Sequence, residues 1–105
     1  MALIDEKCRA PQAGDRPLTA DEARPLLQEV PQWSLAEQAV TRVWKFKDFR
    51  EAMAFVSGVA ALAERDGHHP DILISYNRVQ LTLSTHKIGG LSRNDFILAA
   101  KIDRL

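Results

Sequence analysis

The fold is decided by residues 72–84, which read Ile-Leu-Ile-Ser-Tyr-Asn-Arg-Val-Gln-Leu-Thr-Leu-Ser. Two apolar runs, 72–76 and 79–84, flank the dipeptide Asn77-Arg78. Because Asn tolerates a positive φ angle, this spacing predicts two strands joined by a tight two-residue hairpin. Apolar and polar residues alternate in the second run, which predicts one core face and one polar face.

A second pair of strands is predicted upstream of this hairpin. From Trp33 to Phe46 the hydrophobic pattern has a period of two, which is typical of a strand. A shorter strand at residues 33–35 would pair with the longer one across residues 36–38. Strands joined by such short connections form an antiparallel sheet.

Three helices are predicted from repeated capping signals. Thr19 and Glu22 have the spacing of a capping box, and Asp48 with Glu51 and Ser92 with Asp95 repeat it. The helices are expected at residues 20–30, 49–66 and 93–104, with apolar residues on one face of each.

The expected fold is therefore α+β, in the order α-β-β-α-β-β-α. A four-stranded antiparallel sheet would carry three helices on one face. Residues 1–17 show no period and are interpreted as an extended leader, whereas residues 18–105 form a single domain. The uncovered face and edge of the sheet favour dimerisation.

Composition excludes several classes of protein. Fourteen basic and fourteen acidic residues give a net charge of zero, whereas nucleic acids and anionic membranes both attract an excess of positive charge. The single Cys8 cannot form an intrachain disulfide, and no apolar run is long enough to span a membrane. We therefore expect a cytoplasmic protein.

The three histidines are the candidate chemical groups: His68, His69 and His86. Pro70 favours an extended backbone at His69, and adjacent extended residues point in opposite directions, so the first two rings should have different environments. In a sheet built from hairpins, His86 at the end of the last strand would lie within reach of residues 68–69. Converging histidines can transfer protons in both directions near neutral pH.

Two other interpretations of the histidines stay open from the residues alone. They could be loop and helix-cap residues without a chemical task. They could also bind a zinc ion. Adjacent residues rarely chelate one ion together, however, and no Cys or carboxylate completes a familiar ligand spacing, so we expect no metal site.

The histidines lie in motifs that resemble a known family. The motifs are Glu64-x3-His68-His69-Pro70, Leu81-Thr82-Leu83-Ser84-Thr85-His86, Gly90-Leu91-Ser92 and Asp95. Their combination closely resembles the pterin-4a-carbinolamine dehydratases over about residues 18–105. The leader around Cys8 is similar to that of bacterial members, and Ile72 stands where animal members tend to carry an aromatic residue.

The resemblance implies a defined reaction without a metal or redox cofactor. The family removes the 4a-hydroxyl of 4a-hydroxytetrahydropterin as water, giving quinonoid dihydropterin and supporting tetrahydropterin recycling. By carry-over of the motifs, His68 is the candidate acid for the departing hydroxyl and His86 the candidate group for the proton on N5. His69 would orient the substrate.

Further polar residues are candidates for contacts with the pterin: Glu64, Ser84, Thr85 and Asp95. The two hydroxyls could bind the pterin ring or satisfy strand-end amides. Glu64 could steady His68 one helical turn further on, or be solvated. Asp95 has the position of a helix-capping acid, but could also orient His86.

Other roles remain compatible with the resemblance. Relatives form dimers and tetramers, so a homodimer or homotetramer is expected. Animal relatives also act as partners of a homeodomain transcription factor, which would make the chain a binding or dimerisation module. A third possibility is another pterin pathway, such as one linked to molybdenum cofactor.

Overall fold

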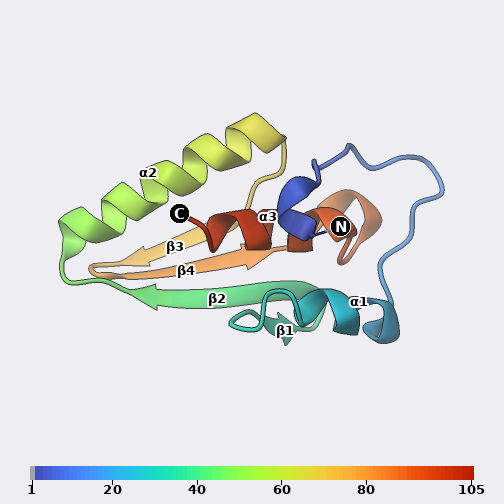
Figure 1. Cartoon of the computed structure of the whole chain (residues 1–105), viewed down its shortest axis with the longest axis horizontal. Coiled ribbons are helices and arrows are strands. Elements are labelled where there is room, and N and C mark those ends of the chain that lie inside the picture. The colour runs from blue at the N-terminus through green and yellow to red at the C-terminus, as the bar shows by residue number, and fades with distance from the viewer. Residues whose placement is uncertain (1) are drawn as a thin grey trace.

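The computed structural model of the protein describes residues 2–105. Its elements follow in the order η1 (Leu3–Asp5), α1 (Ala20–Leu27), β1 (Ser34–Ala36), β2 (Ala39–Lys45), α2 (Phe49–Asp66), β3 (Asp71–Ser75), β4 (Arg78–Leu83), η2 (His86–Ile88) and α3 (Arg93–Ile102), where η marks a 3-10 helix. The predicted α+β fold is confirmed, with three α-helices and a four-stranded antiparallel sheet. Figure 1 shows the arrangement.

The sheet has the strand order β1-β2-β4-β3, and all its neighbouring strands are antiparallel. Val79, Leu81 and Leu83 of β4 are fully buried beneath the helices, whereas Val43 and Leu73 on the opposite face are exposed. This burial pattern follows the alternation in the sequence, because successive strand residues point to opposite faces.

Several predicted boundaries are wrong by one to three residues; β1 spans Ser34–Ala36 instead of residues 33–35, and α3 ends at Ile102 instead of residue 104. Helix α1 ends at Leu27 instead of residue 30, because the amides of Glu29 and Val30 bond to carbonyls only three residues back and close a tighter turn. The hairpin loop is Tyr76-Asn77, one residue earlier than expected, and Tyr76 takes the positive φ of 54°. Asn77 instead exchanges bonds with the backbone of Phe46, which ties the hairpin to the end of β2.

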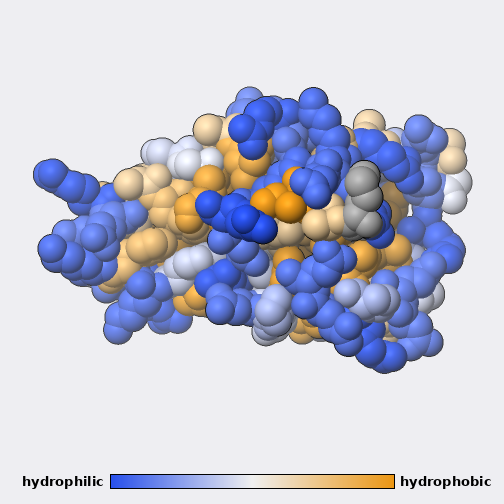
Figure 2. Space-filling model, viewed as in Figure 1, coloured by the Kyte–Doolittle hydropathy of each residue, from blue (hydrophilic) through white to orange (hydrophobic). Residues whose placement is uncertain are grey.

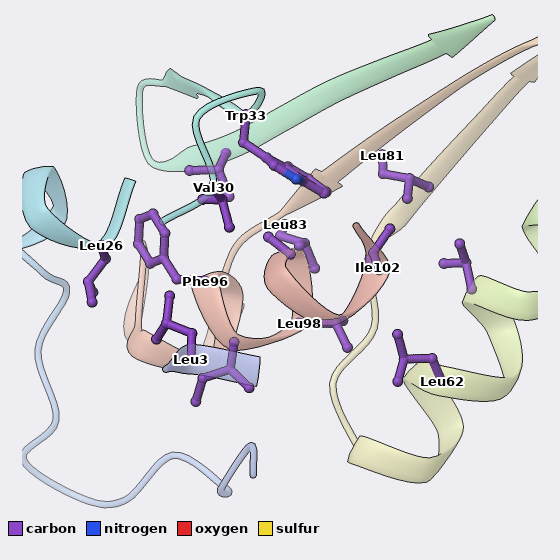
Figure 3. Close-up of a cluster of buried hydrophobic side chains, with 14 of the residues drawn as sticks. Leu3, Leu26, Val30, Trp33, Leu62, Leu81, Leu83, Phe96, Leu98 and Ile102 are labelled. Carbon is purple, nitrogen blue, oxygen red and sulfur yellow. The ribbon is translucent and has the colours of Figure 1, made fainter. Parts of the chain in front are cut away.

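The core lies between the sheet and α3. Figure 3 shows Leu81 and Leu83 of β4 together with Phe96, Leu98 and Ile102 of α3, and all five are buried. Burial of a side chain of this size contributes about 1.5–3 kcal/mol. Trp33 is also buried and donates its indole N–H to Asp103, while Trp44 is only partly buried and meets Trp33 edge-on.

Polar and apolar side chains share the face seen in Figure 1. Figure 2 shows hydrophilic side chains over most of this face, with apolar patches between them. No helix within residues 2–105 is long and apolar enough to cross a membrane.

The leader packs against α3. Leu3 of η1 is buried in the core, and Figure 3 shows it beside Phe96. Glu6 receives two hydrogen bonds from the guanidinium of Arg93, of 2.7 and 2.6 Å. Glu6 of the leader is therefore tied to the first turn of α3.

The Glu6–Arg93 pair predicts a pH dependence of leader docking. Hydrogen bonding from Arg93 holds the pKa of Glu6 below its usual 4.5. A folded-state pKa below the unfolded value contributes stability that is complete above the unfolded pKa and is lost as the pH falls through the folded one. We expect Glu6→Gln to lower the free energy of unfolding by about 0.5–1 kcal/mol at pH 7, and by much less at pH 3.

Urea unfolding of the wild type and Glu6→Gln at both pH values measures this difference. Glu37→Gln, at an exposed loop position, serves as the control and should behave like the wild type. An equal loss at pH 7 and pH 3 would contradict an ionic contribution from Glu6.

Candidate active site

The end of α2 directs the two adjacent histidines. The helix ends at Asp66, and Gly67 takes a left-handed conformation with φ of 68°, which a residue with a Cβ adopts only at a cost. The amide of Gly67 bonds back to the carbonyl of Ala63 at 2.9 Å. The chain then turns away from the helix axis, and His68 becomes buried while His69 stays exposed.

His68 is bound to a buried carboxylate. Its Nε2 lies 2.5 Å from Oδ1 of Asp95. The side chain of His68 is 10% exposed and that of Asp95 is 0% exposed. A carboxylate can only accept hydrogen bonds, so Nε2 of His68 carries the hydrogen of this contact and Nδ1 is the nitrogen left for other partners.

Asp95 receives two further hydrogen bonds on its other oxygen. The backbone N–H of Ser92 donates to Oδ2 at 2.9 Å and the hydroxyl of Thr85 at 3.0 Å. The hydroxyls of Thr85 and Ser92 lie 2.7 Å apart. Because a hydroxyl has one proton and Thr85 donates it to Asp95, the Ser92 hydroxyl is the donor in this last contact.

His69 forms a similar pair at the surface. Its Nε2 lies 2.5 Å from Oε2 of Glu64, but the two side chains are 59% and 78% exposed. Water competes for both partners, so this contact is weaker than that of His68.

His86 lies beside the buried network. It opens η2 directly after Thr85, and its side chain is exposed. Thr85 pairs with Gly90 across this turn. Because Thr85 and His68 share the carboxylate of Asp95, the loop that holds His86 is fixed against the loop that holds His68 and His69.

Comparisons with known proteins place the chain in a family. Residues 16–105 match the family model described as pterin 4 alpha carbinolamine dehydratase. The chain belongs to the pterin-4a-carbinolamine dehydratase family.

Relatives and solved structures agree with this assignment. A protein of Nitrosomonas eutropha, provisionally named a pterin-4-alpha-carbinolamine dehydratase, is 44% identical over 98% of this chain and 92% of its own length. A transcriptional coactivator/pterin dehydratase from Brucella melitensis has a TM-score of 0.79 and 37% identity, covering 86% of this chain and 97% of its own. A pterin dehydratase-like protein described as a RuBisCO assembly factor has a TM-score of 0.56 and 25% identity, covering 69% and 83%.

Two expected contacts of the family's motif residues differ in the structure. Glu64 bonds to His69 and not to His68, because Gly67 ends the helix before the i, i+4 spacing reaches His68. Asp95 bonds to His68 and not to His86. It does so from the first turn of α3, so the residue that caps the helix also holds a histidine.

Two contacts around the site could not be predicted from the sequence. Lys101 of α3 bonds to the buried carboxylate of Asp66 at 2.7 Å and joins the end of α2 to α3. This pair is 35 residues apart, so no helical or strand spacing predicts it. Ser92 was recognisable as a cap, but not as the partner of Thr85.

The environment of Cys8 makes its thiol unreactive. Burial raises the pKa of the Cys8 thiol to about 11, and the negative charge of Asp66 adds to this effect. The thiol is therefore protonated at neutral pH and a poor nucleophile.

Within residues 2–105, no three side chains of His, Cys, Asp or Glu are grouped so that they could hold a metal ion.

The two histidine–carboxylate pairs allow a matched test of burial. We expect Asp95→Asn to lower the free energy of unfolding by about 2 kcal/mol or more. The substitution exchanges one carboxylate oxygen for an NH2 group, so a buried donor loses its acceptor. Glu64→Gln should lower it by about 0.5 kcal/mol or less, since that pair is exposed.

Urea unfolding at pH 7 measures both changes. The two substitutions are isosteric and each affects one histidine, but Asp95 is buried and also accepts hydrogen bonds from Ser92 and Thr85, whereas Glu64 is exposed. Equal losses would show that the buried carboxylate with its three donors contributes no more than the exposed one.

Proposed function

We propose that the protein dehydrates 4a-hydroxytetrahydropterin to quinonoid dihydropterin and water, in support of tetrahydropterin recycling. The observation that carries this proposal is the buried His68–Asp95 pair, linked through Thr85 to the turn of His86. Membership of the dehydratase family supports it. The reaction requires no metal or redox cofactor.

The reaction needs one acid and one base. The bond between C4a and the hydroxyl oxygen breaks, the oxygen takes up a proton and leaves as water, N5 loses its proton, and a C4a–N5 double bond forms. His68 is the proposed acid. The negative charge of Asp95 compensates the positive charge that the ring carries before it donates, and Nδ1 is the nitrogen free to donate.

His86 is the proposed base for the N5 proton. Its exposed ring can accept a proton from a ligand bound at the surface of the site and release it to water. His69 is proposed to orient the pterin, with Glu64 holding its ring. Each well-placed proton-transfer group contributes about 10²–10⁴ to the rate.

The hydroxyl residues divide into two proposed roles. The Thr85 hydroxyl already bonds to Asp95 and Ser92, so Thr85 is proposed to support the site through Asp95. Ser84 is half-buried at the end of β4 and is the better candidate to bond the pterin ring directly.

The test is a direct dehydratase assay. Purified wild type, His68→Ala and His86→Ala are mixed with enzymatically generated 4a-hydroxytetrahydropterin, and quinonoid dihydropterin is followed against the uncatalysed rate. We expect clear acceleration by the wild type and a loss of about 10²-fold or more in each variant. His69→Ala should mainly raise KM, because it removes an orienting contact.

Circular dichroism and thermal melting of each variant control for loss of structure, and Arg24→Gln on the exposed face of α1 is the surface control. A folded wild type that only matches the uncatalysed rate would refute the proposal.

A binding role is the alternative that this outcome would favour. Two similar proteins are described as a transcriptional coactivator and as an assembly factor. In this chain the open sheet face exposes Val43 and Leu73, and β3 is an edge strand. Such a surface suits a protein partner or a second copy in a homodimer or homotetramer. The chemistry of the histidine site gives dehydration the stronger support.

A further inference from the structure

Residues 9–18 of the leader form a strap around the loop of residues 85–92. At one end the backbone N–H of Arg9 donates to Oδ1 of Asn94 at 3.0 Å, and Nδ2 of Asn94 donates to the carbonyl of Arg9 at 2.5 Å. At the other end the N–H of Leu18 donates to the carbonyl of Leu91 at 2.8 Å. Figure 1 shows this blue segment passing around the outside of the orange-to-red segment before α3.

The middle of the strap also lies against the loop. Pro11 and Asp15 line a small cavity together with Thr85 and Ile88. Near the far end, a Cβ added to Gly90 would lie 2.8 Å from Cβ of Pro17, so only glycine fits beneath the strap there. The strap is therefore bonded to the first turn of α3 at its beginning and to the loop at its end, and between them it lines a cavity together with the loop.

The strap is also stiffened by its own contacts. The amide of Gln12 donates to the carboxylate of Asp15 at 2.8 Å, and the amide of Asp15 returns a bond to the carbonyl of Gln12. A segment closed in this way loses little further conformational freedom when it holds the loop.

The loop under the strap carries the proposed chemistry. It contains His86 and Thr85, and Thr85 bonds to Asp95, the partner of His68. Asn94 directly precedes Asp95 and is buried. One side chain thus joins the strap to the helical turn that holds the carboxylate.

We infer that Asn94 is a positioning residue for the proposed dehydration: it anchors the strap that holds the His86 loop and the first turn of α3 in register. The inference rests on the proposed function. Asn94 does not act on the pterin itself, but through Thr85, His86 and Asp95. A misplacement of about 1 Å at a catalytic group can lower a rate about 10²-fold, so the loss of this anchor should lower kcat.

Three variants of the full chain test this inference. Asn94→Ala removes both bonds to Arg9, and Asn94→Asp keeps the acceptor but replaces the donor with an oxygen that faces the Arg9 carbonyl. Gly90→Ala displaces the strap from its other end through Pro17. Gln12→Ala is the matched control, because Gln12 belongs to the strap but is exposed and holds Asp15 through its backbone amide.

Two readouts are combined. Steady-state kinetics below the melting temperature should show kcat reduced about 10-fold or more in Asn94→Ala, Asn94→Asp and Gly90→Ala, and KM within about 3-fold of the wild type. Nitrogen-15 NMR of the histidine rings should show a wild-type His68 with its hydrogen on Nε2, and changed His68 and His86 signals in the three variants. Gln12→Ala should match the wild type in both readouts.

The outcomes separate this inference from the proposed function. If folded Asn94→Ala and Gly90→Ala keep wild-type kcat and histidine signals, Asn94 has only a structural role and the inference is wrong. Should Asn94→Ala fail to fold, Asn94→Asp and Gly90→Ala decide by the same criteria. If the wild type is no dehydratase, the proposed function fails, and the NMR signals still decide whether the strap positions the two histidines.

Discussion

The site depends on the buried hydrogen bond between His68 and Asp95. An ionised carboxylate in a protein core costs several kcal/mol unless donors surround it. Asp95 meets this requirement with one donor from the α2–β3 loop, one from the end of β4 and one from the cap of α3. These three segments must come together for the carboxylate to be buried, so the same group stabilises the fold and assembles the site.

The two histidine–carboxylate pairs have similar geometry but differ in burial. Both pairs have a nitrogen–oxygen distance of 2.5 Å. His68 is held inside with one ring nitrogen fixed, whereas His69 lies at the surface, where water weakens its bond to Glu64. The arrangement combines one fixed ring with two exposed rings, which suits a proton transfer between a bound ligand and water.

Contacts between residues distant in sequence hold the elements that carry His68 and Asp95. Lys101 bonds to Asp66 and joins the ends of α2 and α3, while the leader places Leu3 in the core and binds the first turn of α3. Helix α3 is thus held by α2 on one side and by the leader on the other. The leader begins before the matched family region at residue 16, but it contacts the same helical turn that carries Asp95.

The sequence by itself determined the fold class, the element boundaries to within a few residues and the candidate histidines. Hydrophobic periodicity and capping spacings are local signals, and the two histidine motifs are contiguous. These features can therefore be recognised without knowledge of the packing. Only the tertiary structure decided the partners. The left-handed turn at Gly67 removes His68 from the helical spacing of Glu64, and Asn94 meets Arg9 across 85 residues, a separation for which no local periodicity exists.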